Sequence, residues 1–388
     1  MAKFTEQSAI KLPLKVAFTE TGVNYFIRKK AQITHLKLVD NASERGIELS
    51  TFTPALVQQM IMLGYVSKIE TSALEFSAVR HEFMELSNLI VYSKLYKQFS
   101  SVALTALLSC DCVRMYNRTH PDRIFSEIPS VDISALQSVL KTYEDKRLII
   151  AKRITKPILT EIMLNNKYDN DEKAANSLLV ERFLTKMDLY NWYIILFFSG
   201  DAHFEEIVNT MYRLINEYYQ KSTVAEYIAP MLLEVSGNYE TLNIRNEAKI
   251  IYRGVTFNNT MLLNPAVRQR ILAEIKRKEN YVSISWKFAR TSSSTEKENL
   301  LNISVYNTTT GYSNIKQSIE TTKSANLKKQ TLVDFYRDLP KEQAGSDLGL
   351  YYLSYLEEAC KKVNVKFSSH INELISNDLT VIELNFKF

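Results

Sequence analysis

Glycine and cysteine are both scarce in this sequence. The 388 residues include 9 glycines and 3 cysteines. The glycine count is about a third of average usage, which excludes collagen-like and glycine-rich linker chains. The cysteines, Cys110, Cys112 and Cys360, are too few and too uneven in number for a disulfide framework. We therefore expect free thiols and a reducing compartment such as the cytoplasm.

Long apolar runs are lacking as well. The longest run, Trp192 to Phe198, falls far below the roughly 20 residues that a membrane-spanning helix needs. The N-terminal residues show neither the apolar core nor the small-residue cleavage site of a secretory signal. We expect a cytoplasmic protein without a membrane span.

An excess of charge of one sign is the third absence. Lysine and arginine number 48 against 43 aspartates and glutamates, a net charge of +5. This small excess argues against a dedicated nucleic-acid-binding protein, which carries a concentrated basic face. Hydrophobic residues make up 46% of the chain, the usage of a folded globular protein. At roughly 150 residues per domain, the length predicts two or three domains.

Apolar spacing changes along the chain. Residues 12–48 contain three short strand-like segments, LPLKVAF, VNYFI and ITHLKLV. From residue 54 the apolar spacing lengthens to three and four, as in helices. Asp132 is expected to cap a further helix, and the polar stretch Asn165–Ser177 favours a linker. The predicted parts are a β-rich unit running into helices over 1–120, a helical linker over 121–180 and a C-terminal domain over 181–388.

The C-terminal part alternates strand and helix patterns. WYIILFF, from Trp192, is interpreted as a buried strand, and an amphipathic helix pattern follows it from Phe204. Two further helices, a pair of strands at 281–288 and 301–305, a helix and two final strands complete the order. The predicted fold class is multidomain α+β with a C-terminal α/β sandwich.

A carboxylate and an amide lie four residues apart on one of these helices. Glu234 and Asn238 project from one face, where they can hold magnesium and polarise a hydroxyl beside a nucleotide phosphate. Downstream, a strand ends at Asn307 shortly before Gly311, and Gly345-Ser346-Asp347-Leu348-Gly349 opens an amphipathic helix. Glycines before a helix let the backbone approach a phosphate, which the helix N-terminus favours.

The order of these segments resembles the GHKL ATPase fold of histidine kinases and anti-sigma-factor kinases. The segments WYIILFFSGDAHFEEIVNTMYRLINEYY, MLLEVSGNYETLNI and LVDFYRDLPKEQAGSDLGLYYLSYLEEACKKVNVKFS are similar to the SiaB-type branch of bacterial signalling kinases, over roughly residues 190–388. The resemblance implies an ATP and magnesium site and phosphorylation of a serine or threonine of a partner protein. It implies Glu234 as general base, Asn238 as magnesium ligand, Asn307 at the position that reads the adenine, Gly311 as a further nucleotide-binding residue, and Gly345, Leu348 and Gly349 as the second glycine box.

Two departures from the GHKL pattern keep an alternative open. Asn307 stands where an aspartate usually reads the adenine amino group, and it accepts a hydrogen bond without charge. Asp347 replaces the middle glycine of the glycine box, where its charge would repel phosphate. The alternative function is therefore a catalytically inactive GHKL-like scaffold for protein interaction. Either function is compatible with a homo-oligomer.

A short segment near the N-terminus resembles the (D/N)xSxxG turn of PilZ domains, which bind cyclic di-GMP. Asn41, Ser43 and Gly46 carry the resemblance, which implies an N-terminal unit that responds to this nucleotide. The paired arginines of such domains are absent, and Lys11 and Lys15 fill the interval without the forked guanidinium. The competing interpretation is a polar turn between two strands.

Overall fold

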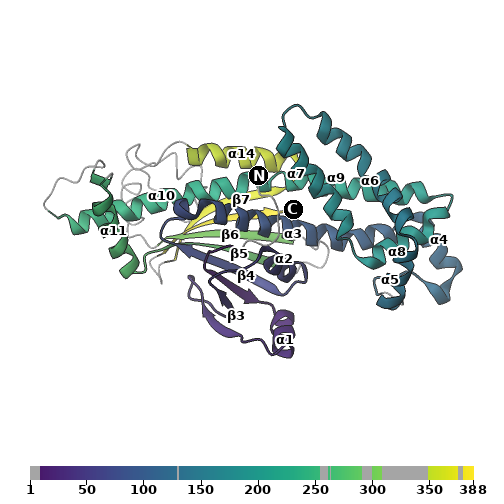
Figure 1. The fold of residues 1–388 in the computed structure, drawn as a ribbon, viewed down its shortest axis with the longest axis horizontal. Helices are drawn as coiled ribbons and strands as arrows, with labels where there is room; N and C mark the ends of the chain where they lie inside the picture. The colour runs from purple at the N-terminus through teal and green to yellow at the C-terminus, as the bar shows by residue number, and fades with distance from the viewer. Residues whose placement is uncertain are drawn as a thin grey trace, which may run out of the picture. The chain divides into compact units, whose positions relative to one another are not determined.

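The computed structural model divides the chain into two compact units (Figure 1). It describes residues 9–128, 131–253, 261–262, 264–290, 299–307, 348–374 and 379–388. One unit is Lys94–Thr223 and contains only helices among its described residues. The other joins Ala2–Ser93 to Val224–Phe388 and contains all the described strands. We call them the helical unit and the sheet unit, and together they confirm the α+β class.

The two units follow other boundaries than the expected 1–120, 121–180 and 181–388. The N-terminal strands pair in one sheet with the C-terminal strands rather than forming a separate β-rich unit. The helical unit is inserted between them, and the chain enters it within the long helix α3 (Arg80–Leu108). The pairing links residues about 200 positions apart in the sequence. The local spacing of apolar residues therefore carries no information about it.

Eight strands of the described chain form a single sheet in the order β2-β3-β1-β4-β5-β6-β8-β7. Every neighbouring pair is antiparallel. The central pair β4–β5, with Glu70 opposite Ser285, joins the N-terminal strands to the C-terminal ones. The strands are β1 (Leu14–Phe18), β2 (Thr34–Lys37), β3 (Ser43–Leu49), β4 (Val66–Ala73), β5 (Val282–Arg290), β6 (Asn299–Asn307), β7 (Lys366–Leu374) and β8 (Leu379–Lys387).

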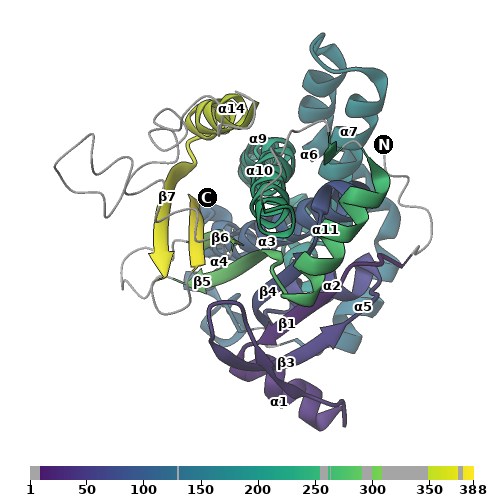
Figure 2. The ribbon, with the colours of Figure 1, turned by 90° about the vertical axis from the view of Figure 1, so that its left-hand side faces the viewer.

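The two faces of the sheet differ in polarity. Because side chains alternate along a strand, Ile284 and Trp286 of β5 lie on one face and Ser283 and Ser285 on the other. Helices α10 (Ala225–Ile251) and α14 (Leu348–Lys362) run side by side over the apolar face and contact β5, β6 and β7 (Figure 2). The sheet thus has a helix-covered apolar face and a polar face.

The segment VNYFI forms a helix, so its prediction as a strand is wrong. It lies in α1 (Glu20–Arg28), where the Thr19 side chain accepts a hydrogen bond from the backbone N–H of Gly22. A Cβ at Gly22 would overlap the Tyr65 carbonyl oxygen, so glycine lets the helix start lie against that backbone. An apolar run this short fits a helix as well as a strand.

The segment WYIILFF is also helical and corrects a second strand prediction. It forms most of α8 (Leu189–Phe197), which Asp188 caps by accepting from the backbone N–H of Tyr190. Nearly all of the helix is buried, and the Trp192 indole donates to the Leu184 carbonyl oxygen at 3.0 Å. A helix that is apolar all round has no 3.6-residue stripe, which explains the misassignment.

The expected linker Asn165–Ser177 contains the start of a helix. α7 (Asn170–Thr185) begins with a capping box in which Asp169 and Glu172 accept each other's backbone N–H groups. The polar residues of this stretch therefore start a helix inside the helical unit and mark no boundary.

Several predicted elements are confirmed. Asp132 caps α5 (Ile133–Thr142) by accepting from the Ser134 backbone N–H, and the late strand pairs occur as β5–β6 and β7–β8. No described helix is both long and apolar enough to cross a membrane.

The remaining helices are α2 (Pro54–Met62), η1 (Phe76–Val79), α4 (Asp111–Thr119), η2 (Pro121–Arg123), α5 (Ile133–Thr142), α6 (Glu144–Leu164), η3 (Phe198–Gly200), α9 (Phe204–Ser222) and α11 (Pro265–Arg277).

Candidate functional site

The predicted magnesium pair lies on α10. Glu234 and Asn238 are both partly buried, and their spacing of four residues puts them on the same side of the helix. Asn307, at the end of β6, is fully buried on the face that α10 covers. The structure therefore places all three in the sheet unit, with Asn307 facing a more C-terminal turn of α10.

The α10 residue that contacts Asn307 is Asn243. Its Nδ2 donates to the Asn307 Oδ1 at 2.9 Å, and both side chains are buried. The Oδ1 of Asn243 has no hydrogen-bond partner in the described part of the chain. A buried amide oxygen without a partner is costly, so this atom is a candidate ligand acceptor or cation ligand.

A carboxylate follows Asn243 by one helical turn. Glu247 is buried on α10, and its two carboxylate oxygens accept hydrogen bonds from the Nζ of Lys278, each at 2.7 Å. Thr380, opposite Asn307 in the β6–β8 register, is buried with its hydroxyl unpaired among the described residues. We call Asn243, Glu247, Asn307 and Thr380 the amide corner.

The predicted glycine box is only partly described. Gly311 and Gly345 lie outside the described residues. Leu348 and Gly349 form the first turn of α14, the helix that runs beside α10. The helix predicted after the glycine motif is therefore present.

The three residues of the PilZ-like segment lie along the β2–β3 hairpin. Asn41 occupies the turn with a φ of 60°, and Ser43 begins β3. Gly46 lies inside β3, where a Cβ would overlap the Val16 carbonyl oxygen of the neighbouring strand. Packing and turn geometry account for Asn41 and Gly46, while cyclic di-GMP binding stays a prediction.

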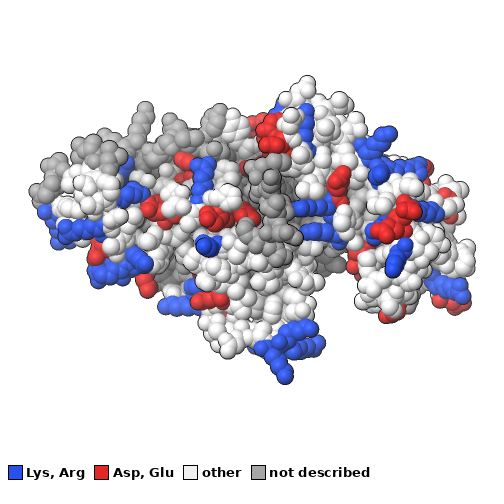
Figure 3. All heavy atoms as spheres, in the orientation of Figure 1, with Lys and Arg blue, Asp and Glu red and all other residues white. Residues whose placement is uncertain are grey.

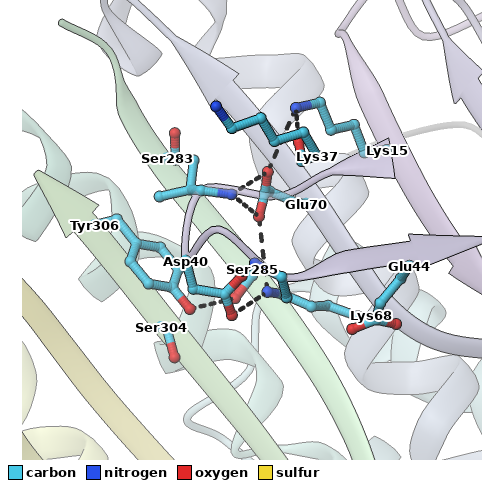
Figure 4. A network of polar contacts seen from close by, with 12 residues as sticks. Lys15, Lys37, Asp40, Glu44, Lys68, Glu70, Ser283, Ser285, Ser304 and Tyr306 are labelled. Carbon is cyan, nitrogen blue, oxygen red and sulfur yellow. Dashed lines mark hydrogen bonds and ion pairs between the residues drawn. The ribbon is translucent and has the colours of Figure 1, made fainter. Parts of the chain in front are cut away.

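A second polar group occupies the polar face of the sheet, and sequence analysis did not identify it (Figure 4). On β4, the Lys68 side chain is 4% exposed and the Glu70 side chain 0% exposed. The Nζ of Lys68 donates to the Asp40 carboxylate at 2.8 Å. Both carboxylate oxygens of Glu70 accept from the backbone N–H of Val39 at 3.2 Å. Two buried charges of one strand thus take partners from the β2–β3 turn.

Hydroxyl groups surround these charges. Ser283, Ser285, Ser304 and Tyr306 of β5 and β6 are buried on the same face, and the Ser285 Oγ lies 3.5 Å from the Tyr306 Oη (Figure 4). The alternation of charged and apolar residues in VSKIETSA was the available signal, because alternating residues of a central strand share one face.

The pKa shifts in this group follow from burial and pairing. Burial raises the pKa of Glu70, and the Val39 N–H and nearby lysines only partly oppose it. For Lys68, burial lowers the pKa, but the hydrogen bond and charge of Asp40 outweigh this effect and leave it raised. For Asp40, burial raises the pKa, but Lys68 outweighs that effect and leaves it lowered. The Lys68–Asp40 pair therefore stays ionised at neutral pH.

Other polar groups offer less. Among the described residues no group of three or more His, Cys, Asp or Glu side chains could hold a metal ion. Lysine and arginine gather at the end of α1 (Figure 3), where Arg28, Lys29 and Lys30 are exposed. This basic group is confined to one short helix end.

Comparison with known proteins identifies relatives but no activity. A family described as "Family of unknown function (DUF8084)" matches residues 5–388. A Treponema pallidum (strain Nichols) protein named "Uncharacterized protein" is 30% identical over 389 residues, covering 100% of both chains. No solved structure matches the chain. Because the match spans nearly the whole sequence, the chain belongs to the DUF8084 family.

Proposed function

We propose that the chain is a cytoplasmic signal-transduction protein of GHKL type whose sheet unit binds ATP and magnesium. It would phosphorylate a serine or threonine of a partner protein. The order α10, α11, β5–β6, α14 and β7–β8 supports this proposal, because it matches the order that the resemblance implies. Strands β5, β6, β8 and β7 pair antiparallel, and α10 and α14 cover them. The proposed nucleotide site lies between these helices and strands.

The observation that carries the proposal is the hydrogen bond between Asn243 and Asn307. An asparagine amide offers an acceptor beside a donor, which matches the amino group and adjacent ring nitrogen of adenine. The unpaired Oδ1 of Asn243 is an oxygen ligand of the kind that magnesium accepts. The amide corner therefore has chemistry for both parts of the nucleotide complex.

A second candidate pair for magnesium lies further along α10 than Glu234 and Asn238. At 1.5 Å rise per residue, Glu234 lies about 13.5 Å and Asn238 about 7.5 Å along the helix axis from Asn243. Asn243 and Glu247 offer an amide and a carboxylate at the same four-residue spacing but in the reverse order along α10, with Asn243 beside Asn307. We assign them the roles that the resemblance gave to Asn238 and Glu234.

In the proposed reaction the partner hydroxyl oxygen bonds to the γ-phosphorus while the bond to the β–γ bridging oxygen breaks. ADP leaves, and the hydroxyl proton passes to a carboxylate, for which Glu247 is the candidate. Glu247 must then exchange its contact with Lys278 for the substrate hydroxyl.

The alternative of an inactive scaffold is favoured by one observation. Asn243 and Asn307 are almost fully enclosed, at 3% and 0% exposure. A nucleotide can enter only when neighbouring side chains move aside. The apparent affinity is therefore the intrinsic affinity multiplied by the fraction of molecules that are open. In the scaffold, the same hydrogen bond only fastens α10 to β6.

Thermal unfolding with and without ATP and magnesium distinguishes the two functions, because a ligand that binds the native state raises the midpoint. We expect a shift for wild type and for Asn238→Ala, and none for Asn243→Ala. Asn302→Ala is the matched control, since Asn302 donates to Asn385 at 2.8 Å across β6 and β8 on the other face of the sheet. A shift that only Asn238→Ala removes would return the site to Glu234 and Asn238. No shift at millimolar ATP in wild type would support the scaffold.

A further inference from the structure

The turn between β2 and β3 reaches far across the polar face of the sheet. This latch turn, Leu38–Ala42, is closed by a hydrogen bond from the Leu38 N–H to the Ala42 carbonyl oxygen at 3.0 Å. In the sheet order, β1 lies between β3 and β4, yet the turn contacts β4 directly. Val39 extends further and packs on Tyr306 of β6 and on Leu379 and Val381 of β8.

The latch turn supplies the partners of two buried charges. Lys68 binds the Asp40 carboxylate (Figure 4), and Glu70 accepts the Val39 backbone N–H. Both groups of the turn leave together if it lifts, because they belong to neighbouring residues. The turn therefore docks as one element.

A second arrangement of charges is already within reach. The Lys68 Nζ lies 3.8 Å from one oxygen of Glu70, and the Lys15 Nζ lies 3.8 Å from the other. Lys68 and Glu70 therefore already form an ion pair in the docked state (Figure 4), and with the turn lifted neither charge is left alone. Because Lys68 keeps this partner when it loses Asp40, the same charges have one arrangement with the turn docked and another with it lifted, as a switch requires.

When the latch turn is docked on the sheet, Val39 and Lys68 both contact Tyr306 at the end of β6. The Lys68 Nζ lies 5.9 Å from the centroid of the Tyr306 ring, on which Val39 also packs. The next residue, Asn307, points to the opposite face and binds Asn243. The latch turn and the amide corner therefore hold two consecutive residues of one strand from its two faces.

We propose that the latch turn switches between docked and lifted states, and that lifting loosens the end of β6 at Tyr306 and Asn307. Its consequence for ATP rests on the proposed function: the β2–β3 hairpin regulates the affinity of the amide corner. Whatever stabilises the lifted hairpin then weakens nucleotide binding.

Hydrogen exchange of the full chain, followed by mass spectrometry, tests the coupling without a nucleotide. Asp40→Asn removes the charge that Lys68 binds, at a side chain that is 30% exposed and so tolerates the change. We expect at least about fivefold faster exchange in peptides that cover the turn and in peptides that cover Tyr306, Asn307 and Thr380. This factor corresponds to the free energy of the charged hydrogen bond that the substitution removes. Glu48→Gln is the matched control, since it neutralises an exposed carboxylate of the same hairpin.

Each outcome decides one part. Faster exchange confined to the turn, with β6 and β8 as in wild type, would overturn the inference. A second variant, Lys68→Met, must reproduce the β6 effect, and unchanged exchange there would also overturn it. ATP affinity measured on the same proteins is expected to fall several-fold in Asp40→Asn. Coupled exchange without any ATP binding in wild type would contradict the proposed function and leave the latch in place.

Discussion

At the scale of single residues, Gly46 leaves no room for a side chain. A Cβ there would overlap the Val16 carbonyl oxygen and meet the Leu36 side chain, and neither backbone can give way inside paired strands. We expect Gly46→Ala to lower the free energy of unfolding by about 3 kcal/mol or more. Gly237, inside α10, has open space where an added methyl group would lie, so Gly237→Ala should raise stability by about 0.5–1 kcal/mol. Urea unfolding of the two variants measures both, and equal effects would contradict the steric argument.

Glu70 makes stability depend on pH in a direction opposite to most carboxylates. Its pKa is raised in the folded protein above the ordinary 4.5, so the native state binds the proton more tightly than the unfolded chain does. The contribution of this residue therefore falls as pH rises from 4.5 through the folded pKa. Glu70→Gln should gain stability relative to wild type as the pH rises from 4.5 through the folded pKa of Glu70. Urea titrations at several pH values check this, and parallel curves for the two proteins would exclude it.

At the scale of elements, the contact between α10 and η1 depends on one carboxylate. Glu240 accepts from the Phe76 backbone N–H at 2.5 Å and from the Ser77 hydroxyl at 2.8 Å, at the N-terminal end of η1. Each hydrogen bond to a charged group contributes about 1.5–3 kcal/mol. Glu240→Ala should therefore cost about 3 kcal/mol in unfolding free energy. Glu358→Ala, which removes only an exposed ion pair with Lys362, is the control and should leave the unfolding free energy close to that of wild type.

Elements with a clear period or cap were predictable from sequence, and elements without them were not. The strong alternation of LTVIELNFKF indicated β8, and Asp132 marked the start of α5. α8 has no polar stripe, so its sequence shows no helical period. Asn243 was missed because a spacing rule cannot tell which turn of a helix faces β6. Lys68 and Glu70 became a pair of buried charges only through long-range strand pairing.

At the scale of the whole molecule, each unit contains one of the two tryptophans. Trp192 lies in the helical unit and Trp286 in the sheet unit, and both are buried. Variants with a single tryptophan, Trp192→Phe and Trp286→Phe, therefore report on one unit each. Because each unit has its own core, we expect two unfolding midpoints, and Glu240→Ala should lower the one that Trp286 reports. Coincident midpoints that shift together would show one cooperative structure.

The pairing of β4 with β5 also determines when the protein can fold during synthesis. The Ser72 and Ser283 hydroxyls share a hydrogen bond across 211 positions of sequence, and the helical unit is translated entirely between them. On the ribosome, the helical unit can complete its local contacts before β5 is synthesised. During that time β4 has an edge without its β5 partner. The nascent chain therefore exposes that edge until β5 emerges, and this interval is when a chaperone would matter most.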